Sequence, residues 1–202
     1  MILLLLAWFL FYFLHSLLAA TAVKAWLLHR LPACREPRYR LFYNLFAGST
    51  LLAALWVHRQ TDSPLLYQPG TGHTVAAICL LAAGAGVLLA AFRNFRLRSF
   101  AGLEREDYSA LVTGGIHRLI RHPLYTGTAL LLLGWCLQDP LLKNFLLLAL
   151  TLLYIGVGSR LEEHKLLQLY GEAYRQYRQQ VPAFLPHLFG LLLILQANQY
   201  PV

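Results

Sequence analysis

The chain has 202 residues, of which 58% are hydrophobic and only 13% are charged, and its formal net charge is +8. A soluble domain is about 45–50% apolar, so this composition excludes an ordinary soluble protein and indicates a membrane protein. A positive charge would suit nucleic acid, but all of the 17 Lys and Arg residues except Arg59 and Lys143 fall into three clusters between apolar runs. We therefore exclude nucleic acid as a partner and expect the basic clusters to meet membrane lipid.

Three long uncharged runs occupy the first half of the chain. They are Ile2–Val23, Leu41–Val57 and Thr74–Phe92, with 22, 17 and 19 residues. A helix needs about 20 such residues to cross a bilayer, so each run predicts a span. The first run exceeds the apolar core of a signal peptide, and we expect it to stay attached.

Two shorter apolar runs follow later, Leu124–Leu137 and Asn144–Ser159, and they flank the turn sequence Asp139-Pro140. This pattern predicts a C-terminal helical hairpin. With the N-terminus outside, the three basic clusters fall in the cytoplasm, as the positive-inside rule requires. We expect an all-α, multi-pass integral membrane protein with about five transmembrane helices.

A polar, basic motif, Gly-Ile-His-Arg-Leu-Ile-Arg-His-Pro-Leu-Tyr at 115–125, opens the hairpin. Proline fixes its own φ and disfavours the helical region for the residue before it, so a helix should begin at Pro123 with His122 outside it. The N–H groups of that first turn attract an anion or a carboxylate. Alternatively, Arg118 and Arg121 anchor a membrane helix at the cytoplasmic surface.

A second motif covers Arg160–Tyr177 and contains the pair Glu162-Glu163. Read as one helix, its apolar, aromatic and carboxylate positions share a single face; these are Glu163, Leu166, Leu167, Tyr170, Tyr174 and Tyr177. An amphipathic helix at the headgroups would show the same period. If the hairpin returns the chain to the same membrane surface, both carboxylates would face the basic motif.

Together the two motifs offer a carboxylate for hydroxyl or ammonium groups and aromatic faces for a flat base or a cation. His122 and the helix N–H groups would suit a ligand carboxylate. No charge crosses the bilayer in any predicted span, which argues against a pump or a channel.

The two motifs, with Thr126-Gly127 after the first and Val181-Pro182 and Leu185-Pro186 after the second, resemble the isoprenylcysteine carboxyl methyltransferase family and its small bacterial relatives. The resemblance covers Gly114–Pro186. It implies a helical protein of a prokaryotic inner membrane with a cytoplasmic cap that binds S-adenosyl-L-methionine, and a lipophilic or prenylated acceptor. We expect one domain over 1–202, with three spans in 1–92 and the motif-bearing catalytic part in 114–186.

The resemblance also implies roles for particular residues. The expected cofactor contacts are His117, His122, Pro123, Tyr125, Gly127, Glu162, Glu163 and Tyr174. The expected catalytic residues are Arg121, Glu163 and Arg178. No metal is implied, and the three cysteines, Cys34, Cys79 and Cys136, have neither metal-binding nor disulfide spacing.

Two departures from the family pattern bear on the acceptor. His117 stands where a tyrosine is frequent, and Gln180 stands where an arginine suited to a substrate carboxylate is frequent. The carboxylate of an isoprenylcysteine-like substrate is the leading expectation, and a small thiol is the alternative. An NADPH-dependent reductase of the sterol type and a non-catalytic accessory protein remain as further hypotheses.

Four other features carry expectations. His15 in the first span is either a functional group or a histidine bonded to a neighbouring backbone. Tyr39–Asn44 has the composition of an interfacial anchor, and Ala83–Gly86 suits close helix packing. The apolar run Phe184–Leu195 is too short to span and should lie at the interface.

Overall fold

The computed structural model describes residues 1–30, 36–93 and 110–186, and within these ranges it is helical, with an isolated bridge between Leu65 and Leu141 in place of any strand. The elements in chain order are α1 (Ile2–Ala19), α2 (Thr21–Arg30), α3 (Glu36–Gln60), α4 (Thr71–Arg93), η1 (Gly115–Arg118), α6 (Pro123–Gln138), α7 (Leu142–Tyr170) and α8 (Glu172–Gln180). The all-α fold predicted from the sequence is confirmed.

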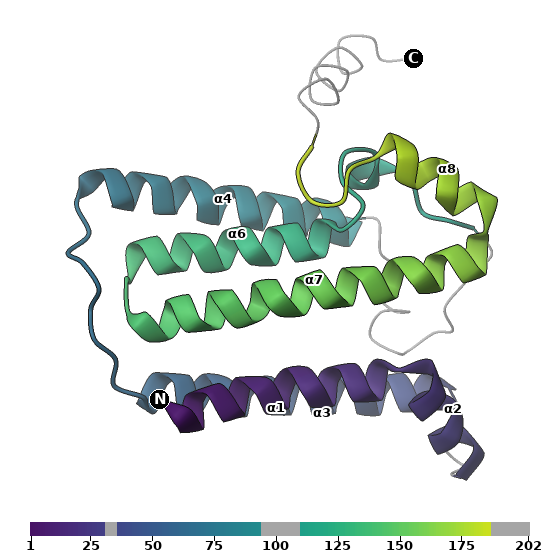
Figure 1. Ribbon diagram of the computed structural model, residues 1–202, viewed down its shortest axis with the longest axis horizontal. Coiled ribbons are helices and arrows are strands. Elements are labelled where there is room, and N and C mark those ends of the chain that lie inside the picture. The colour runs from purple at the N-terminus through teal and green to yellow at the C-terminus, as the bar shows by residue number, and fades with distance from the viewer. Residues whose placement is uncertain (31–35, 94–109, 187–202) are drawn as a thin grey trace.

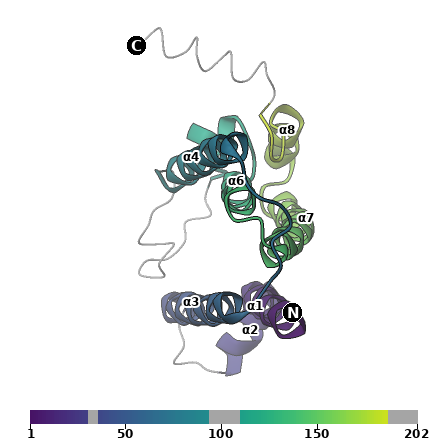
Figure 2. The same cartoon turned by 90° about the vertical axis from the view of Figure 1, so that its left-hand side faces the viewer.

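The long helices form two layers (Figures 1 and 2). One layer contains α4, α6 and α7, and the other contains α1 and α3. Within the first layer, glycines let α4 and α6 approach closely. A Cβ on Gly84 would come within 2.9 Å of the Gly127 carbonyl oxygen, and one on Gly127 would come within 2.7 Å of Leu88. The close packing expected around Gly84 is therefore confirmed.

Four of these helices are long and apolar enough to cross a membrane, judged by length and composition. They are α1, α4, α7 and the part of α3 from Arg38 onward. The remaining predicted span, the run Leu124–Leu137, corresponds to α6, which has 16 residues and lies between α4 and α7. The chain is thus an integral membrane protein, and its helix order matches the one expected.

The first span is shorter than its apolar run. Helix α1 ends at Ala19, Ala20 is extended with φ −65° and ψ 130°, and α2 begins at Thr21. Eighteen residues of α-helix reach roughly 27 Å, about the thickness of the hydrocarbon core. The break therefore falls where the segment carrying Lys24 and Arg30 would meet the headgroups.

The predicted hairpin is confirmed, because α6 ends at Gln138 and α7 begins at Leu142. Its turn pairs with the α3–α4 connection. The Leu66 N–H donates to the Pro140 carbonyl at 2.8 Å, and the Leu142 N–H donates to the Pro64 carbonyl at 3.0 Å. These bonds tie the two layers together at one end of the bundle, which we call the outer end.

A buried chain of hydrogen bonds lies at the same end, and we call Trp8, His58, Asn144 and Asp139 the outer network. The Trp8 indole donates to His58 Nδ1 at 3.2 Å, and His58 Nε2 lies 2.8 Å from Asn144 Oδ1. The Asn144 amide donates to the Asp139 carbonyl at 2.6 Å and to its carboxylate at 3.1 Å. Because Nδ1 accepts, the His58 proton is on Nε2.

The opposite end carries η1, α8 and α2 (Figure 1). It also carries the described residues of the three basic clusters, among them Arg30, Arg93, Arg121 and Arg178. We call this the basic end. Parts of two predictions lie outside the described residues: Cys34 and most of the run Phe184–Leu195.

Two local expectations are corrected at this end. The single helix predicted over Arg160–Tyr177 is wrong, because Gly171 has φ +54° and separates α7 from α8. Tyr39 is buried, and its phenol donates to the Leu18 carbonyl of α1, so it packs against a helix and does not anchor at the lipid interface. The period of side chains could reveal neither the break at Gly171 nor the contact of Tyr39 with α1.

Candidate functional site

The site begins where His122 precedes α6. His122 has φ −119° and ψ 64°, outside the helical region, and Pro123 occupies the first helical position, as the sequence predicted. The His122 side chain is 4% exposed and its ring stacks on Tyr125, with centroids 5.5 Å apart. The local backbone therefore fixes His122 at the start of α6.

An extended segment, Val181–Phe184, lies along this start, and we call it the strap. Val181 has φ −115° and ψ 127°, as expected before Pro182. The N–H groups of Arg121 and His122 donate to the carbonyls of Pro182 and Ala183 at 2.9 and 3.0 Å. The strap thus joins the end of α8 to the first motif.

Arg121, His122 and Glu163 form a charged cluster beneath the strap. The Arg121 guanidinium donates to Glu163 Oε1 through Nε at 3.0 Å and through a terminal nitrogen at 2.5 Å. Its other terminal nitrogen donates to the carbonyls of Arg178 and Val181 at 2.9 and 2.5 Å. His122 Nε2 lies 3.2 Å from the same Glu163 oxygen. The cluster binds α6, α7, α8 and the strap to one another.

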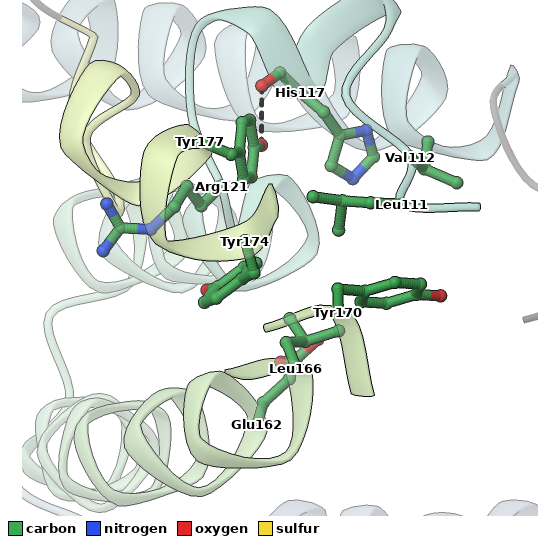
Figure 3. Close-up of a pocket in the computed structure, with 9 residues that line it drawn as sticks. All are labelled: Leu111, Val112, His117, Arg121, Glu162, Leu166, Tyr170, Tyr174 and Tyr177. Carbon is green, nitrogen blue, oxygen red and sulfur yellow. Dashed lines mark hydrogen bonds between the residues drawn. The ribbon is translucent and has the colours of Figure 1, made fainter. Parts of the chain in front are cut away.

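A cavity of about 200 Å³ lies beside the charged cluster, and we call it the polar cavity (Figure 3). Its lining comes from η1 and the residues before it, from the end of α7 and from α8. The residues are Leu111, Val112, His117, Arg121, Glu162, Leu166, Tyr170, Tyr174 and Tyr177. Aromatic rings, a carboxylate and an imidazole therefore face one space.

The lining includes a polar atom without a partner. The Tyr174 side chain is 0% exposed, and its hydroxyl has no hydrogen-bond partner among the described residues. An unsatisfied buried hydroxyl costs roughly 1–3 kcal/mol, so a native structure retains one where a ligand or water completes it. Burial raises the pKa of Tyr174 to about 12, so the phenol stays protonated and can donate.

Tyr177 and His117 form the wall between α8 and η1. The Tyr177 phenol donates to the His117 carbonyl at 2.7 Å, as Figure 3 shows. Burial raises the pKa of Tyr177 to about 12 and lowers the pKa of His117 below 6.5. His117 is therefore neutral at pH 7, with one N–H donor and one acceptor nitrogen in its ring.

A second polar space of about 140 Å³ shares His117, Arg121 and Glu162 with the polar cavity, and we call it the adjoining cavity. The first turn of α6 also lines it. Tyr125 lies at its edge, with its ring stacked on His122. The two spaces together reach the lower end of the roughly 300–1,000 Å³ typical of ligand pockets.

Tyr125 connects the polar spaces to apolar ones. It lines a cavity of about 340 Å³ between α6 and α7, closed by Phe184 and Leu185, which we call the lateral cavity. It also lines a cavity of about 390 Å³ between the two layers, which we call the inner cavity. A water-soluble molecule at the basic end and an apolar molecule in the bundle would meet at Tyr125.

The structure brings most of the predicted site residues together, but it separates the two carboxylates. Glu162 lines both polar spaces, and its Oε2 lies 3.5 Å from His122 Nδ1. Glu163 is turned to Arg121 and His122: its Oε1 accepts two hydrogen bonds from Arg121 and lies 3.2 Å from His122 Nε2, and its Oε2 lies 3.9 Å from Arg178. Glu162 is therefore the carboxylate placed for a ligand, and Glu163 holds the charged cluster.

Two other predicted residues lie away from the polar spaces. Gly127 is at the contact of α6 with α4, where it serves packing. The Arg178 side chain is 44% exposed and lies 3.9 Å from Glu163, while its carbonyl accepts from Arg121. The remaining predicted residues, His117, His122, Pro123, Tyr125 and Tyr174, line or adjoin these spaces.

The strap carbonyls were not predicted as part of the site. Val181, Pro182 and Ala183 bind Arg121 and His122 through backbone oxygens, which any residue carries. The signal in the sequence is the pair Pro182 and Pro186, since prolines hold a chain extended and leave carbonyls free to accept. Leu111 and Val112 had no such signal.

Comparison with known protein families gives a match over almost the whole chain. The family model described as NnrU protein matches residues 3–197. No solved structure matches the chain.

Named relatives are similar to the chain over different lengths. A methanethiol S-methyltransferase of Crocosphaera subtropica is 28% identical over 86% of this chain and 70% of its own length. A protein-S-isoprenylcysteine O-methyltransferase of Schizosaccharomyces pombe is 39% identical over 41% of this chain and 36% of its own length. A Delta(14)-sterol reductase of Mus musculus is 33% identical over 45% of this chain and 23% of its own length. The predicted relationship to membrane methyltransferases of the isoprenylcysteine type is confirmed.

Proposed function

Because the chain belongs to the NnrU protein family, and relatives over most of its length are named methyltransferases, we propose that it transfers a methyl group from S-adenosyl-L-methionine to a lipophilic acceptor. The observation that carries the proposal is the buried Tyr174 hydroxyl, unpartnered among the described residues, in a cavity that also holds the Glu162 carboxylate.

The chemistry of the polar and adjoining cavities fits this donor. Glu162 would accept from an ammonium group or from ribose hydroxyls, and Tyr174 would donate to a ring nitrogen or an oxygen. The tyrosine faces suit adenine and a sulfonium cation. The first turn of α6 faces the adjoining cavity, where its N–H groups would bind the donor carboxylate.

The protein's part in the reaction is to bind and orient. The sulfonium methyl group that the donor supplies is already electrophilic, so the chain needs to align the acceptor and exclude water. Tyr125 stands between the polar spaces and the apolar cavities, where the two substrates would meet. Arg121 and Glu163 would hold that geometry through the charged cluster.

The basic end would face the cytoplasm, with the N-terminus outside. The clusters that contain Arg30, Arg93 and Arg121 lie at that end, as the positive-inside rule predicts for the cytoplasmic side. A soluble donor would then reach the polar cavity from the cytoplasm, and an acceptor would reach the apolar cavities from the bilayer.

The test is transfer of a labelled methyl group from S-adenosyl-L-methionine by the protein in lipid nanodiscs, offered both prenylcysteines and thiols. We expect incorporation by the wild type and a loss of about 100-fold in Glu162→Gln, because that substitution removes a charge at the ligand. Glu172→Gln is the matched control, since Glu172 is 61% exposed and pairs with Arg175. Equal rates in Glu162→Gln and the wild type would refute the assignment.

A second candidate is an NADPH-dependent reductase, which the similarity to the mouse sterol reductase favours. The phosphates of NADPH call for several cations. Among the described residues that line the polar cavity, Arg121 supplies a guanidinium that is already bonded to Glu163 and two carbonyls. S-adenosyl-L-methionine therefore fits the polar cavity better than NADPH does. The two proposed functions predict different ligands in a binding experiment.

A further inference from the structure

The inner cavity lies between the two helix layers and has room for much more than a one-carbon molecule. Its volume of about 390 Å³ is roughly thirteen times the share of one water in the liquid. Most of the lining is apolar and comes from all four surrounding helices, for example Trp8, Leu51, Leu132 and Ile155. An occupant would therefore be largely apolar.

One part of the inner cavity is polar, and His15 is at its centre. The phenol oxygen of Tyr43 lies 3.1 Å from His15 Nδ1 and 3.0 Å from Nε2. A neutral imidazole has one N–H and one lone pair, and a single hydroxyl bonds well to only one of them at a time. With Tyr43 accepting from the protonated nitrogen, the other nitrogen can accept a proton.

The neighbours of His15 are neutral hydroxyl groups. Tyr12 and Thr151 share a hydrogen bond of 2.6 Å, and the Ser16 hydroxyl donates to Tyr154 at 3.2 Å. Tyr154 also faces His15, with ring centroids 6.3 Å apart. Among the described residues that line the inner cavity, none is Asp, Glu, Lys or Arg. His15 is therefore the group there that is best able to take up a proton.

Tyr125 connects His15 to the proposed donor site. It lines the inner cavity together with His15 and Tyr154, and it lines the adjoining cavity together with His122 and Glu162. An acceptor held beside His15 would therefore approach the donor methyl group past Tyr125.

Resting on the proposed methyl transfer, we propose that the inner cavity binds the acceptor, that the acceptor is a thiol with an apolar substituent, and that His15 accepts its proton. A carboxylate would enter this lining with no cation to pair it, which costs several kcal/mol. A thiol is far less acidic than a carboxyl group, so it enters neutral and needs a base to become the nucleophilic thiolate.

The step balances within these groups. The S–H bond breaks, and its proton passes to the free nitrogen of His15. The sulfur lone pair forms a bond to the methyl carbon, and the bond from that carbon to the sulfonium sulfur breaks with its electron pair left on that sulfur. The products are a methyl thioether, the demethylated donor and a proton that leaves from His15.

The experiment compares His15→Gln with the wild type in nanodiscs, using straight-chain thiols of increasing length, a more acidic aromatic thiol, and a prenylcysteine. We expect His15→Gln to lower kcat for the alkyl thiols by about 100-fold, with a smaller change in KM. The loss should shrink as pH rises and for the aromatic thiol, because both supply thiolate without a base. His73→Gln, at an exposed histidine of the outer end, is the control.

Two readouts separate this proposal from the proposed function. Thiol binding should change the fluorescence of Trp8 and Trp135, which line the inner cavity, and longer thiols should bind more tightly. Donor binding should be unchanged in His15→Gln. Failure of the wild type to bind the donor would contradict the proposed function itself. Three outcomes would each overturn the acceptor proposal while donor binding is retained. In the first, only the prenylcysteine is methylated; in the second, thiols are methylated equally well by His15→Gln and the wild type. In the third, bulk lipid displaces the thiol and no turnover occurs.

Discussion

The outer network and the charged cluster are both buried sets of polar groups that join helices distant in sequence, yet they differ in how completely they are satisfied. In the outer network every donor meets an acceptor: Trp8 bonds to His58, His58 to Asn144, and Asn144 to Asp139. Beside the charged cluster, Tyr174 has a buried hydroxyl with no partner among the described residues, and Glu162 faces open space.

The difference indicates that the outer network serves stability and that the groups beside the charged cluster serve function. A closed network, in which each donor already has its acceptor, fixes the helices and leaves nothing to offer a ligand. The charged cluster holds Arg121 and Glu163 in place and leaves the Tyr174 hydroxyl and the Glu162 carboxylate available at its edge. The two ends should therefore respond differently to the loss of single groups.

Arg121→Ala should have the largest effect. It removes bonds to Glu163 and to two carbonyls, and it leaves the Glu163 carboxylate largely buried without its cation. We expect a loss of about 3 kcal/mol in the free energy of unfolding and no measurable donor binding. Thermal unfolding in detergent measures the change in stability, and calorimetry measures donor binding. Donor binding retained at wild-type strength would show that the charged cluster does not shape the site.

Asn144→Ala tests the other end. It leaves His58 Nε2 and the Asp139 carboxylate without their partner in a buried place. The free energy of unfolding should fall by about 2–3 kcal/mol while the dissociation constant of the donor stays the same. The same two measurements apply. A change of donor affinity in the folded variant would show that the two ends are coupled.

Tyr174→Phe should have a smaller and opposite pair of effects. Removing an unpartnered hydroxyl leaves the free protein as stable as before or slightly more stable, whereas the bound donor loses one hydrogen bond. We expect donor affinity to fall about tenfold. If Tyr174→Phe destabilises the free protein and binds the donor normally, the hydroxyl serves the fold.

The pH dependence of donor binding should show the smallest effect. Burial lowers the pKa of His117 below 6.5, so the ring is neutral above that pH and gains a charge only as the pH falls through the lowered value. Its positive charge would then face Arg121 and a cationic donor. Affinity measured by calorimetry over about pH 5–8 should be flat at the upper end and weaken at the lower end. Comparison with His117→Asn isolates the part of this pH dependence that comes from His117. Tighter binding at low pH would contradict this account.

The sequence predicted what depends on local pattern. Apolar runs predicted the spans, Pro123 predicted the start of α6, and Asp139-Pro140 predicted the turn. The two motifs were correctly expected to meet, because a hairpin returns the chain to its starting side.

Other features depend on how distant elements meet and were not predictable from the pattern. The period of Glu163, Tyr170 and Tyr174 suited one helix, but Gly171 adopts φ +54° and divides it. Adjacent carboxylates look alike in sequence, and only the position of Arg121 makes Glu163 the bound partner and Glu162 the exposed one. His15 was expected to have a functional or a backbone role, and its actual neighbour is the Tyr43 side chain of α3.

The most direct test of the account is calorimetric binding of S-adenosyl-L-methionine, its demethylated product and NADPH to the detergent-purified protein, with Glu162→Gln alongside. The account predicts micromolar binding of the donor or its product, lost in Glu162→Gln and kept in Glu172→Gln. Binding of NADPH alone would contradict it, since a site built around Glu162 and the Tyr174 hydroxyl would then serve a different chemistry.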